Sequence, residues 1–161
     1  MPLRAGGSAG KQYSAEVTVI VETLTEVDDE IVEAFDRLLP QLSQTAEQLD
    51  REALGQLISA ESTVVLVARS DGKIVGTLSL VMFSIPSGLR ARVEDVVVDD
   101  SARGQGIGAA LIEEAKSRAA AAGARTLDLT SRASRTEANR LYERLGFQVR
   151  ESRVYRFTPI G

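Results

Sequence analysis

The stretch that most constrains this chain runs from Arg92 to Gly108, where an apolar strand leads into the glycine-rich start of a helix. Positions 96 to 98 are three valines in succession, a pattern typical of a strand covered on both faces. Glycine occupies positions 104, 106 and 108, which leaves backbone N–H groups unshielded where the helix dipole favours negative charge. The stretch therefore predicts an anion site, to which Arg103 adds a positive charge suited to phosphate.

Two other interpretations of the glycines are open at this point. A glycine cluster is also compatible with a tight turn that holds no ligand. Residues 104–109 fit the G-x-G-x-x-A dinucleotide fingerprint as well, with Asp128 near the place of its ribose-binding acid. In that fingerprint the first glycine follows the strand almost directly, whereas a polar turn intervenes here, and too few strands follow for a doubly wound fold. Both observations count against the dinucleotide interpretation.

The amino-acid composition limits which side chains could act in a reaction or bind a metal. The 161 residues include no cysteine and no histidine, which excludes disulfides, thiol nucleophiles, a histidine base and the usual zinc ligands. We therefore expect no metal, and chemistry that uses carboxylates, tyrosine, serine, lysine, water or backbone. The net charge of −4 does not favour a nucleic-acid partner. No apolar run reaches membrane-spanning length and no signal-peptide core is present, so we expect no membrane partner and a cytoplasmic protein.

The periodicity of the chain predicts an α/β (α+β) domain over residues 15–161, after a flexible tail at 1–14. The predicted first helix begins near Thr25 and ends at Pro40, and a capping-box pattern at Thr45 opens the second. Another such pattern, Ser134 with Glu137, opens the last helix. Strands are predicted at 15–24, 63–69, 73–83, 92–98, 125–130 and 148–157, with helices at 25–39, from 45, at 107–122 and at 134–145. The fourth and fifth strands would be parallel, joined by a right-handed crossover.

Three sequence blocks together resemble one family. Residues 103–108, Arg-Gly-Gln-Gly-Ile-Gly, match the R/Q-x-x-G-x-G/A signature of the GNAT superfamily of acyl-CoA-dependent N-acyltransferases. Residues 93–98 before it and 139–147 after it agree with the family in order and spacing. The resemblance implies a single domain with a central mixed, mostly antiparallel sheet, flanked by helices, in which the parallel fourth and fifth strands splay apart.

The resemblance also implies where acetyl-CoA binds. The pyrophosphate would lie on the amides of residues 103–108 and the pantetheine arm along the fourth strand, where a backbone N–H, such as that of Val97, would polarise the thioester carbonyl. Tyr142 would protonate the departing thiolate, and Asn139 would contact the cofactor. The alternative for the valines and Tyr142 is packing in the core. The implied cofactor-binding set is Val96, Val97, Val98, Arg103, Gly104, Gln105, Gly106, Ile107, Gly108, Asn139 and Tyr142.

Two adjacent carboxylates, Glu94 and Asp95, begin the apolar part of the fourth strand. In a regular strand they face opposite sides, so at least one would meet covered surface, which is costly for a charge. A bulge at this point would re-aim them into the cleft, where either is a candidate for the base that takes the amine proton. The alternative is a structural role, such as pairing with Arg90 or Arg92.

The expected activity is transfer of acetyl from acetyl-CoA to a primary amine of a small molecule, by direct attack in a ternary complex. The alternatives are a non-catalytic acyl-CoA-binding or sensing module, and an acetyltransferase for protein N-termini or lysines. The acceptor is unreadable from the sequence, although Arg37 or Arg90 would suit an acidic group on it. A homodimer is usual for the resemblance.

Overall fold

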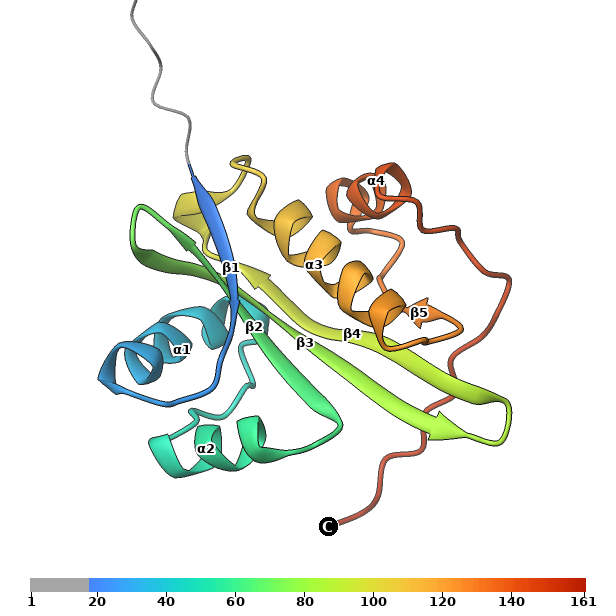
Figure 1. Ribbon diagram of the computed structural model, residues 1–161, viewed down its shortest axis with the longest axis horizontal. Coiled ribbons are helices and arrows are strands. Elements are labelled where there is room, and N and C mark those ends of the chain that lie inside the picture. Colours follow the sequence, from blue (N-terminus) through green and yellow to red (C-terminus); the bar gives the residue numbers. More distant parts are fainter. Residues whose placement is uncertain (1–17) are drawn as a thin grey trace, which may run out of the picture.

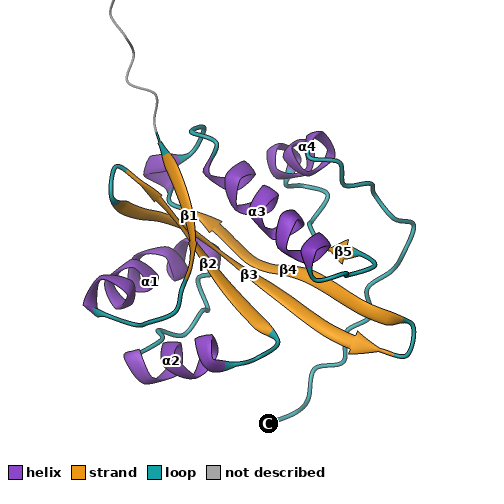
Figure 2. Cartoon of the chain, in the orientation of Figure 1, coloured by secondary structure: helices purple, strands orange, loops and turns teal. Residues whose placement is uncertain are grey.

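The computed structural model describes residues 18–161 and forms one mixed sheet with helices on both faces (Figures 1 and 2). The tail predicted at 1–14 and the start of the predicted first strand lie outside the described residues. Along the chain the elements are β1 (Val19–Thr23), α1 (Asp29–Leu42), α2 (Arg51–Ser59), β2 (Thr63–Ser70), β3 (Lys73–Ile85), β4 (Gly88–Val98), a 3₁₀ turn (Asp100–Ala102), α3 (Ile107–Ala121), β5 (Leu127–Asp128) and α4 (Thr136–Arg144).

The sheet confirms the predicted fold class. Its strand order is β1-β2-β3-β4-β5; the first four strands are antiparallel neighbours, and β4 and β5 are parallel. The parallel pairing joins only Ala91 with Leu127 and Arg92 with Asp128. Beyond that point β4 continues to Val98 along β3 alone. The parallel pair is therefore open toward the carboxyl end of β4, as the splayed arrangement predicts.

Two apolar layers cover the sheet. Helices α3 and α4 pack on one face, where Leu111, Ile112 and Tyr142 share a cluster with β2, β3 and β4 residues. Helices α1 and α2 pack on the other face, around Leu38 and Leu54 (Figure 1). Both leucines are fully buried.

A β-bulge in β4 confirms the irregularity predicted beside the two carboxylates. Glu94 pairs with Ser79 but Val97 pairs with Thr77, so β4 has one residue more than β3 over this step. Asp95 has a φ of 50°, in the left-handed region. The bulge reverses the alternation of the strand: Val93 and Val96 pack on the α3 side, whereas Val97 packs against α1 and α2.

The predicted starts of the first two helices were wrong. Asp28, not Thr25, caps α1 by accepting from the Ile31 N–H at 2.9 Å. Asp50, not Thr45, caps α2 by accepting from the Ala53 N–H at 2.8 Å. Aspartate is a stronger N-cap than threonine. Where the cap stands relative to the buried face of the helix decides which of the two residues begins it.

The predicted end of the first helix was also wrong, because Pro40 lies inside the last turn of α1. A proline there removes the hydrogen bond to the carbonyl of Asp36, an exposed residue that water can satisfy. Burial of Leu38 in the preceding turn holds the helix in place.

The last third of the chain departs most from the prediction. Helix α4 has no side-chain cap, so the Ser134–Glu137 capping box was wrong. The strand predicted at 125–130 is reduced to Leu127–Asp128, and the strand predicted at 148–157 does not form. A strand needs a partner with free backbone groups, and β5 presents only a two-residue edge. The segment instead runs past the sheet with Tyr155 and Phe157 each 86% exposed.

Candidate active site

The N-terminus of α3 has no side chain over its first backbone N–H groups. Its N-cap residue is Gly106, in the left-handed region with φ 79°, and neither a side-chain cap nor an acidic residue is present in the first turn. Helices α1 and α2, by contrast, are capped by aspartates and carry acids in their first turns. The first N–H groups of a helix have no partner within it, so those of α3 remain available to a negatively charged ligand.

The loop before α3 keeps these groups accessible. Gly104 has a φ of 76°, so both Gly104 and Gly106 adopt a conformation that residues with side chains rarely accept. No atom lies within 4 Å of a Cβ built on either glycine. Arg103 is exposed and forms an ion pair with Asp100 at 2.8 Å.

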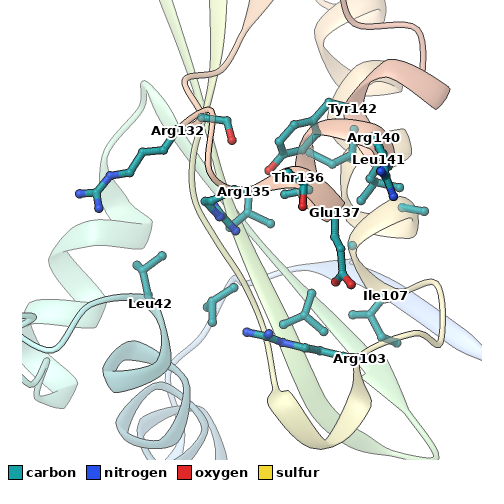
Figure 3. A pocket seen from close by; sticks show the side chains of 18 of the residues that line it. Leu42, Arg103, Ile107, Arg132, Arg135, Thr136, Glu137, Arg140, Leu141 and Tyr142 are labelled. Atoms are coloured by element: carbon teal, nitrogen blue, oxygen red, sulfur yellow. The ribbon is translucent and has the colours of Figure 1, made fainter.

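A cleft of about 1310 Å³ opens beside this loop (Figure 3). Its walls are the end of β4, the loop and first turn of α3, residues 130–136, and α4, with Gln41 and Leu42 of α1 on the opposite side. The open splay between β4 and β5 therefore leads directly into the space in front of the α3 N-terminus. The predicted site residues that line the cleft are Val96, Val97, Val98, Arg103, Gly104, Gly106, Ile107, Gly108 and Tyr142.

Arginines dominate the charge of the cleft. Among residues 18–161, six arginines line it, against a single carboxylate, that of Glu137. The chain as a whole has a net charge of −4, so positive charge is concentrated in the cleft against the overall balance. Of these only Arg103 was predicted from the sequence as a site residue; the others are Arg132, Arg135, Arg140, Arg144 and Arg156. Arg140 and Arg144 stand in the 139–147 block of the family resemblance, whereas Arg132, Arg135 and Arg156 lie outside the three blocks.

Tyr142 combines a packing role with access to the cleft. Tyr142 is 9% exposed and belongs to the core cluster beneath α3. The ring meets Phe147 edge to face, with centroids 6.1 Å apart, and the Tyr142 carbonyl accepts from the Phe147 N–H at 3.0 Å. These contacts hold the ring in one orientation among the residues that line the cleft (Figure 3).

The two candidate bases lie at the bulge and not among the residues that line the cleft. Arg92 Nε donates to Glu94 Oε1 at 3.0 Å, and the Glu94 side chain is 46% exposed. This is one of the structural pairings that the sequence left open. Asp95 is exposed at the left-handed position of the bulge. Both carboxylates are thus accessible to water beside the open part of β4.

Two predicted cofactor contacts also fall outside the cleft lining, namely Gln105 and Asn139. Gln105 is exposed in the glycine loop. Asn139 Nδ2 donates to the Arg132 carbonyl at 3.0 Å. Asn139 therefore holds the arginine-bearing loop against α4. None of the helices in residues 18–161 has the length and apolar character needed to cross a membrane.

Comparisons with known proteins bear on the family and the fold. The sequence profile of the acetyltransferase (GNAT) family matches residues 25–147. A search of curated proteins gave no match.

Among solved structures, an acetyltransferase of Trypanosoma brucei is 26% identical, with a TM-score of 0.72 over 88% of this chain and 100% of that chain. Ribosomal-protein-alanine N-acetyltransferase from Brucella melitensis biovar Abortus 2308 is 26% identical, with a TM-score of 0.69 over 88% and 100%. An aminoglycoside acetyltransferase from an uncultured soil metagenomic sample is 22% identical, with a TM-score of 0.77 over 89% and 97%, and supports the fold alone.

Proposed function

Because this chain belongs to the acetyltransferase (GNAT) family, we propose that it transfers the acetyl group of acetyl-CoA to a primary amine of a small molecule. The observation that carries the proposal is the α3 N-terminus, uncapped and glycine-lined, at the mouth of an arginine-rich cleft. An ADP-bearing thioester requires such a site, because its phosphates are polyanionic. The transfer takes place in the cleft of a single domain that we expect to be cytoplasmic.

The residues present fit acetyl-CoA from end to end. The amides of residues 103–108 would hold the pyrophosphate, and the cleft arginines would balance the remaining phosphate charge. Val96 and Val98 would pair with the pantetheine arm along the part of β4 that β5 leaves open. The N–H of Val97 is the candidate to polarise the carbonyl. Gln105 and Asn139 stay proposed contacts, Asn139 through the loop that it fixes.

The chain's own groups handle two protons. When bound, acetyl-CoA supplies an activated thioester; the amine nitrogen forms the new bond to carbon as the carbon–sulfur bond breaks. The Tyr142 hydroxyl gives its proton to the thiolate sulfur that leaves. Glu94, through water, takes the proton that the amine loses, and Asp95 is the alternative acceptor one residue further along the bulge. Both roles follow from general acid–base catalysis at neutral pH.

A second acceptor class is favoured by one comparison. The relative from Brucella melitensis is described as a ribosomal-protein-alanine N-acetyltransferase, and it is more similar in sequence than the aminoglycoside enzyme. A peptide N-terminus is therefore the runner-up to a small-molecule amine.

Thiol release from acetyl-CoA tests the proposal. The panel contains aminoglycosides, amino sugars and peptides that begin with alanine, and each product is confirmed by mass spectrometry. We expect turnover with at least one small amine. Turnover only with peptides would transfer the proposal to the runner-up. Calorimetric binding of acetyl-CoA with no turnover across the panel would instead support a non-catalytic acyl-CoA-binding module.

A further inference from the structure

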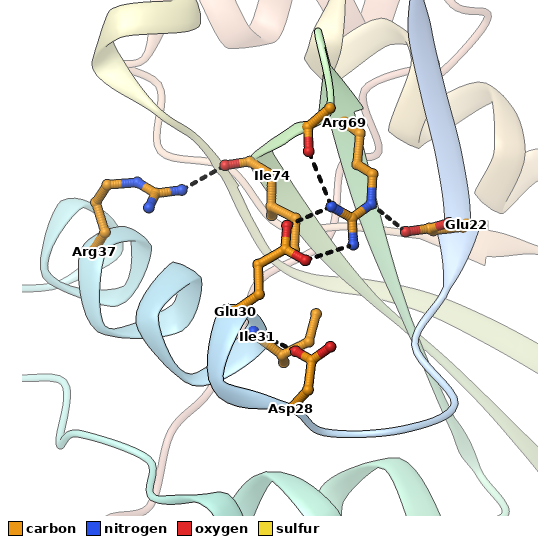
Figure 4. A network of polar contacts seen from close by, with 8 residues as sticks. Glu22, Asp28, Glu30, Ile31, Arg37, Arg69 and Ile74 are labelled. Carbon is orange, nitrogen blue, oxygen red and sulfur yellow. Dashed lines mark hydrogen bonds and ion pairs between the residues drawn. The ribbon is translucent and has the colours of Figure 1, made fainter.

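A polar network joins α1 to the turn that precedes the glycine loop. Asp99 directly follows β4 and is 5% exposed. Arg37 Nε donates to Asp99 Oδ2 at 3.0 Å, across 62 positions of sequence. Arg37 Nη2 also donates to the carbonyl of Ile74 in β3 (Figure 4). Two nitrogens of Arg37 are thus bonded within the protein itself.

The second carboxylate oxygen of Asp99 stabilises the 3₁₀ turn that follows. Asp99 Oδ1 accepts from the Ser101 N–H at 3.1 Å and from the Ser101 hydroxyl at 2.9 Å. The Asp99 N–H donates to the Val75 carbonyl at 2.8 Å. The N–H of Ser101, followed by its hydroxyl and Arg37, holds the pKa of Asp99 below its usual value, although burial acts in the opposite direction.

A second residue of α1 holds the same turn. Gln41 Oε1 accepts from the Asp100 N–H at 2.8 Å, and Gln41 Nε2 donates to the Arg37 carbonyl at 3.1 Å. Arg37 and Gln41 lie one helical turn apart, so both reach the turn from the same face of α1. Gln41 also lines the cleft. One helix therefore forms a wall of the cleft and anchors the loop beside it.

Removing Arg37 would leave the Asp99 carboxylate buried without its countercharge, which is costly. The carboxylate would then move toward water and pull the 3₁₀ turn with it. Arg103 and Gly104 follow that turn directly, so a displaced turn misplaces the amides in front of α3.

We propose that Arg37 and Asp99 are positioning residues that hold the 103–108 loop in the geometry that binds the diphosphate of acetyl-CoA. This inference rests on the proposed function. It assigns Arg37 no contact with substrate; Arg37 acts through Asp99 and the turn. The effect of replacing Arg37 on thioester binding must therefore depend on whether the thioester carries a diphosphate.

Two thioesters separate positioning from general stability. Acetyl-CoA carries the diphosphate, whereas acetyl-pantetheine carries the same reacting group without it. For Arg37→Gln we expect KM for acetyl-CoA to rise about ten- to a hundredfold, the effect of a small misplacement of a binding group. KM for acetyl-pantetheine and kcat with both thioesters should change less than about twofold, because the reacting end is untouched. Calorimetry should show the same loss for CoA.

Conservative and matched variants complete the experiment. Arg37→Lys keeps one donor and the charge, so it should recover part of the affinity for acetyl-CoA. Asp99→Asn keeps an acceptor for Ser101 and removes the charge, and it provides the same comparison if Arg37→Gln does not fold. Arg69→Gln is the matched control. Arg69 of β2 is ion-paired with Glu22 and Glu30 and is not bonded to the 103–108 loop, so the substitution removes a comparable pair elsewhere (Figure 4). It should lower the melting temperature and leave the ratio of the two KM values unchanged.

Equal changes with both thioesters, or no change with either, would overturn the inference. Wild-type protein that binds CoA but acetylates no amine contradicts the proposed catalysis alone, since the calorimetric comparison still decides the role of Arg37. Wild-type protein that does not bind CoA contradicts both.

Discussion

At the scale of single residues, Tyr142 is where packing and chemistry are easiest to separate. Tyr142→Phe removes the hydroxyl and keeps the ring, whose edge contact with Phe147 needs no oxygen. We expect kcat to fall by about 10²-fold or somewhat less, the low end of general-acid effects. KM for acetyl-CoA should change little, because the ring still fills its place. Undiminished turnover in a folded variant would return Tyr142 to a packing role.

Glu94→Gln should behave differently from Tyr142→Phe. With the carboxylate gone, the ammonium substrate must lose its proton to solvent, so activity should partly recover as pH rises and free amine becomes abundant. Profiles of kcat/KM against pH for wild type, Glu94→Gln, Asp95→Asn and Tyr142→Phe make the comparison. Recovery confined to Asp95→Asn would identify Asp95 as the base. Parallel, uniformly lowered profiles would reject this division of roles.

The lowered pKa of Asp99 predicts that part of the free energy of unfolding is lost at acid pH. Its native pKa is lowered, so its contribution is complete above the unfolded value near 3.8 and is lost as pH falls through the lowered native value. The difference in unfolding free energy between wild type and Asp99→Asn should therefore be constant near neutrality and shrink in acid. Urea unfolding from pH 7 to pH 3 measures it. A difference that grows in acid would contradict the sign.

At the scale of elements, Gly76 of β3 decides how closely α3 lies on the sheet. A Cβ built there would be 2.9 Å from Ile107 Cγ2 and 3.2 Å from both Leu111 Cδ1 and the Val97 carbonyl oxygen. Gly76→Ala should therefore displace the first turn of α3 and cost about 1–3 kcal/mol of stability. Because Ile107 begins the helix, affinity for acetyl-CoA should fall as well.

Gly55 in α2 is the matched control for that substitution. Its Cβ would meet nothing within 4 Å, so Gly55→Ala should stabilise the protein by about 0.5–1 kcal/mol through helix propensity. Chemical unfolding of the two variants beside wild type tests both signs. Equal effects at the two glycines would exclude close packing of α3 as the cause.

At the scale of the whole molecule, ligand binding should stabilise the folded state by mass action. Acetyl-CoA at a hundredfold excess over its Kd should add about 2.7 kcal/mol and raise the melting temperature. NADH and ATP share only phosphates with it and should produce smaller shifts. A larger shift with NADH than with acetyl-CoA would revive the dinucleotide interpretation of the glycine motif.

Features that depend on neighbouring residues were predictable from the sequence. The break between the strands predicted at 63–69 and 73–83, the strand that ends at Val98 and the start of α3 at Ile107 all appear where expected. Local sterics decide them: glycine alone accepts the loop's positive φ values at little cost, and successive β-branched residues favour an extended chain. For the same reason the glycine-rich, uncapped start of α3 could be predicted before any tertiary contact was known, and the anion proposed to bind there follows from that local geometry.

Tertiary structure decided what depends on distant partners. The N-caps are Asp28 and Asp50 and not the predicted Thr25 and Thr45. Burial of Phe35 in α1 and of Leu54 in α2 sets where each helix begins. Residues 148–157 have the composition of a strand, yet a ladder requires a partner edge, and β5 provides two residues. Arg37 bonds to Asp99 across 62 positions, and folding brings arginines of the glycine loop, of residues 132–135, of α4 and of the C-terminal segment to one cleft. Hydrogen bonds and charge pairs between distant residues carry no local periodicity, so only the packed molecule determines them.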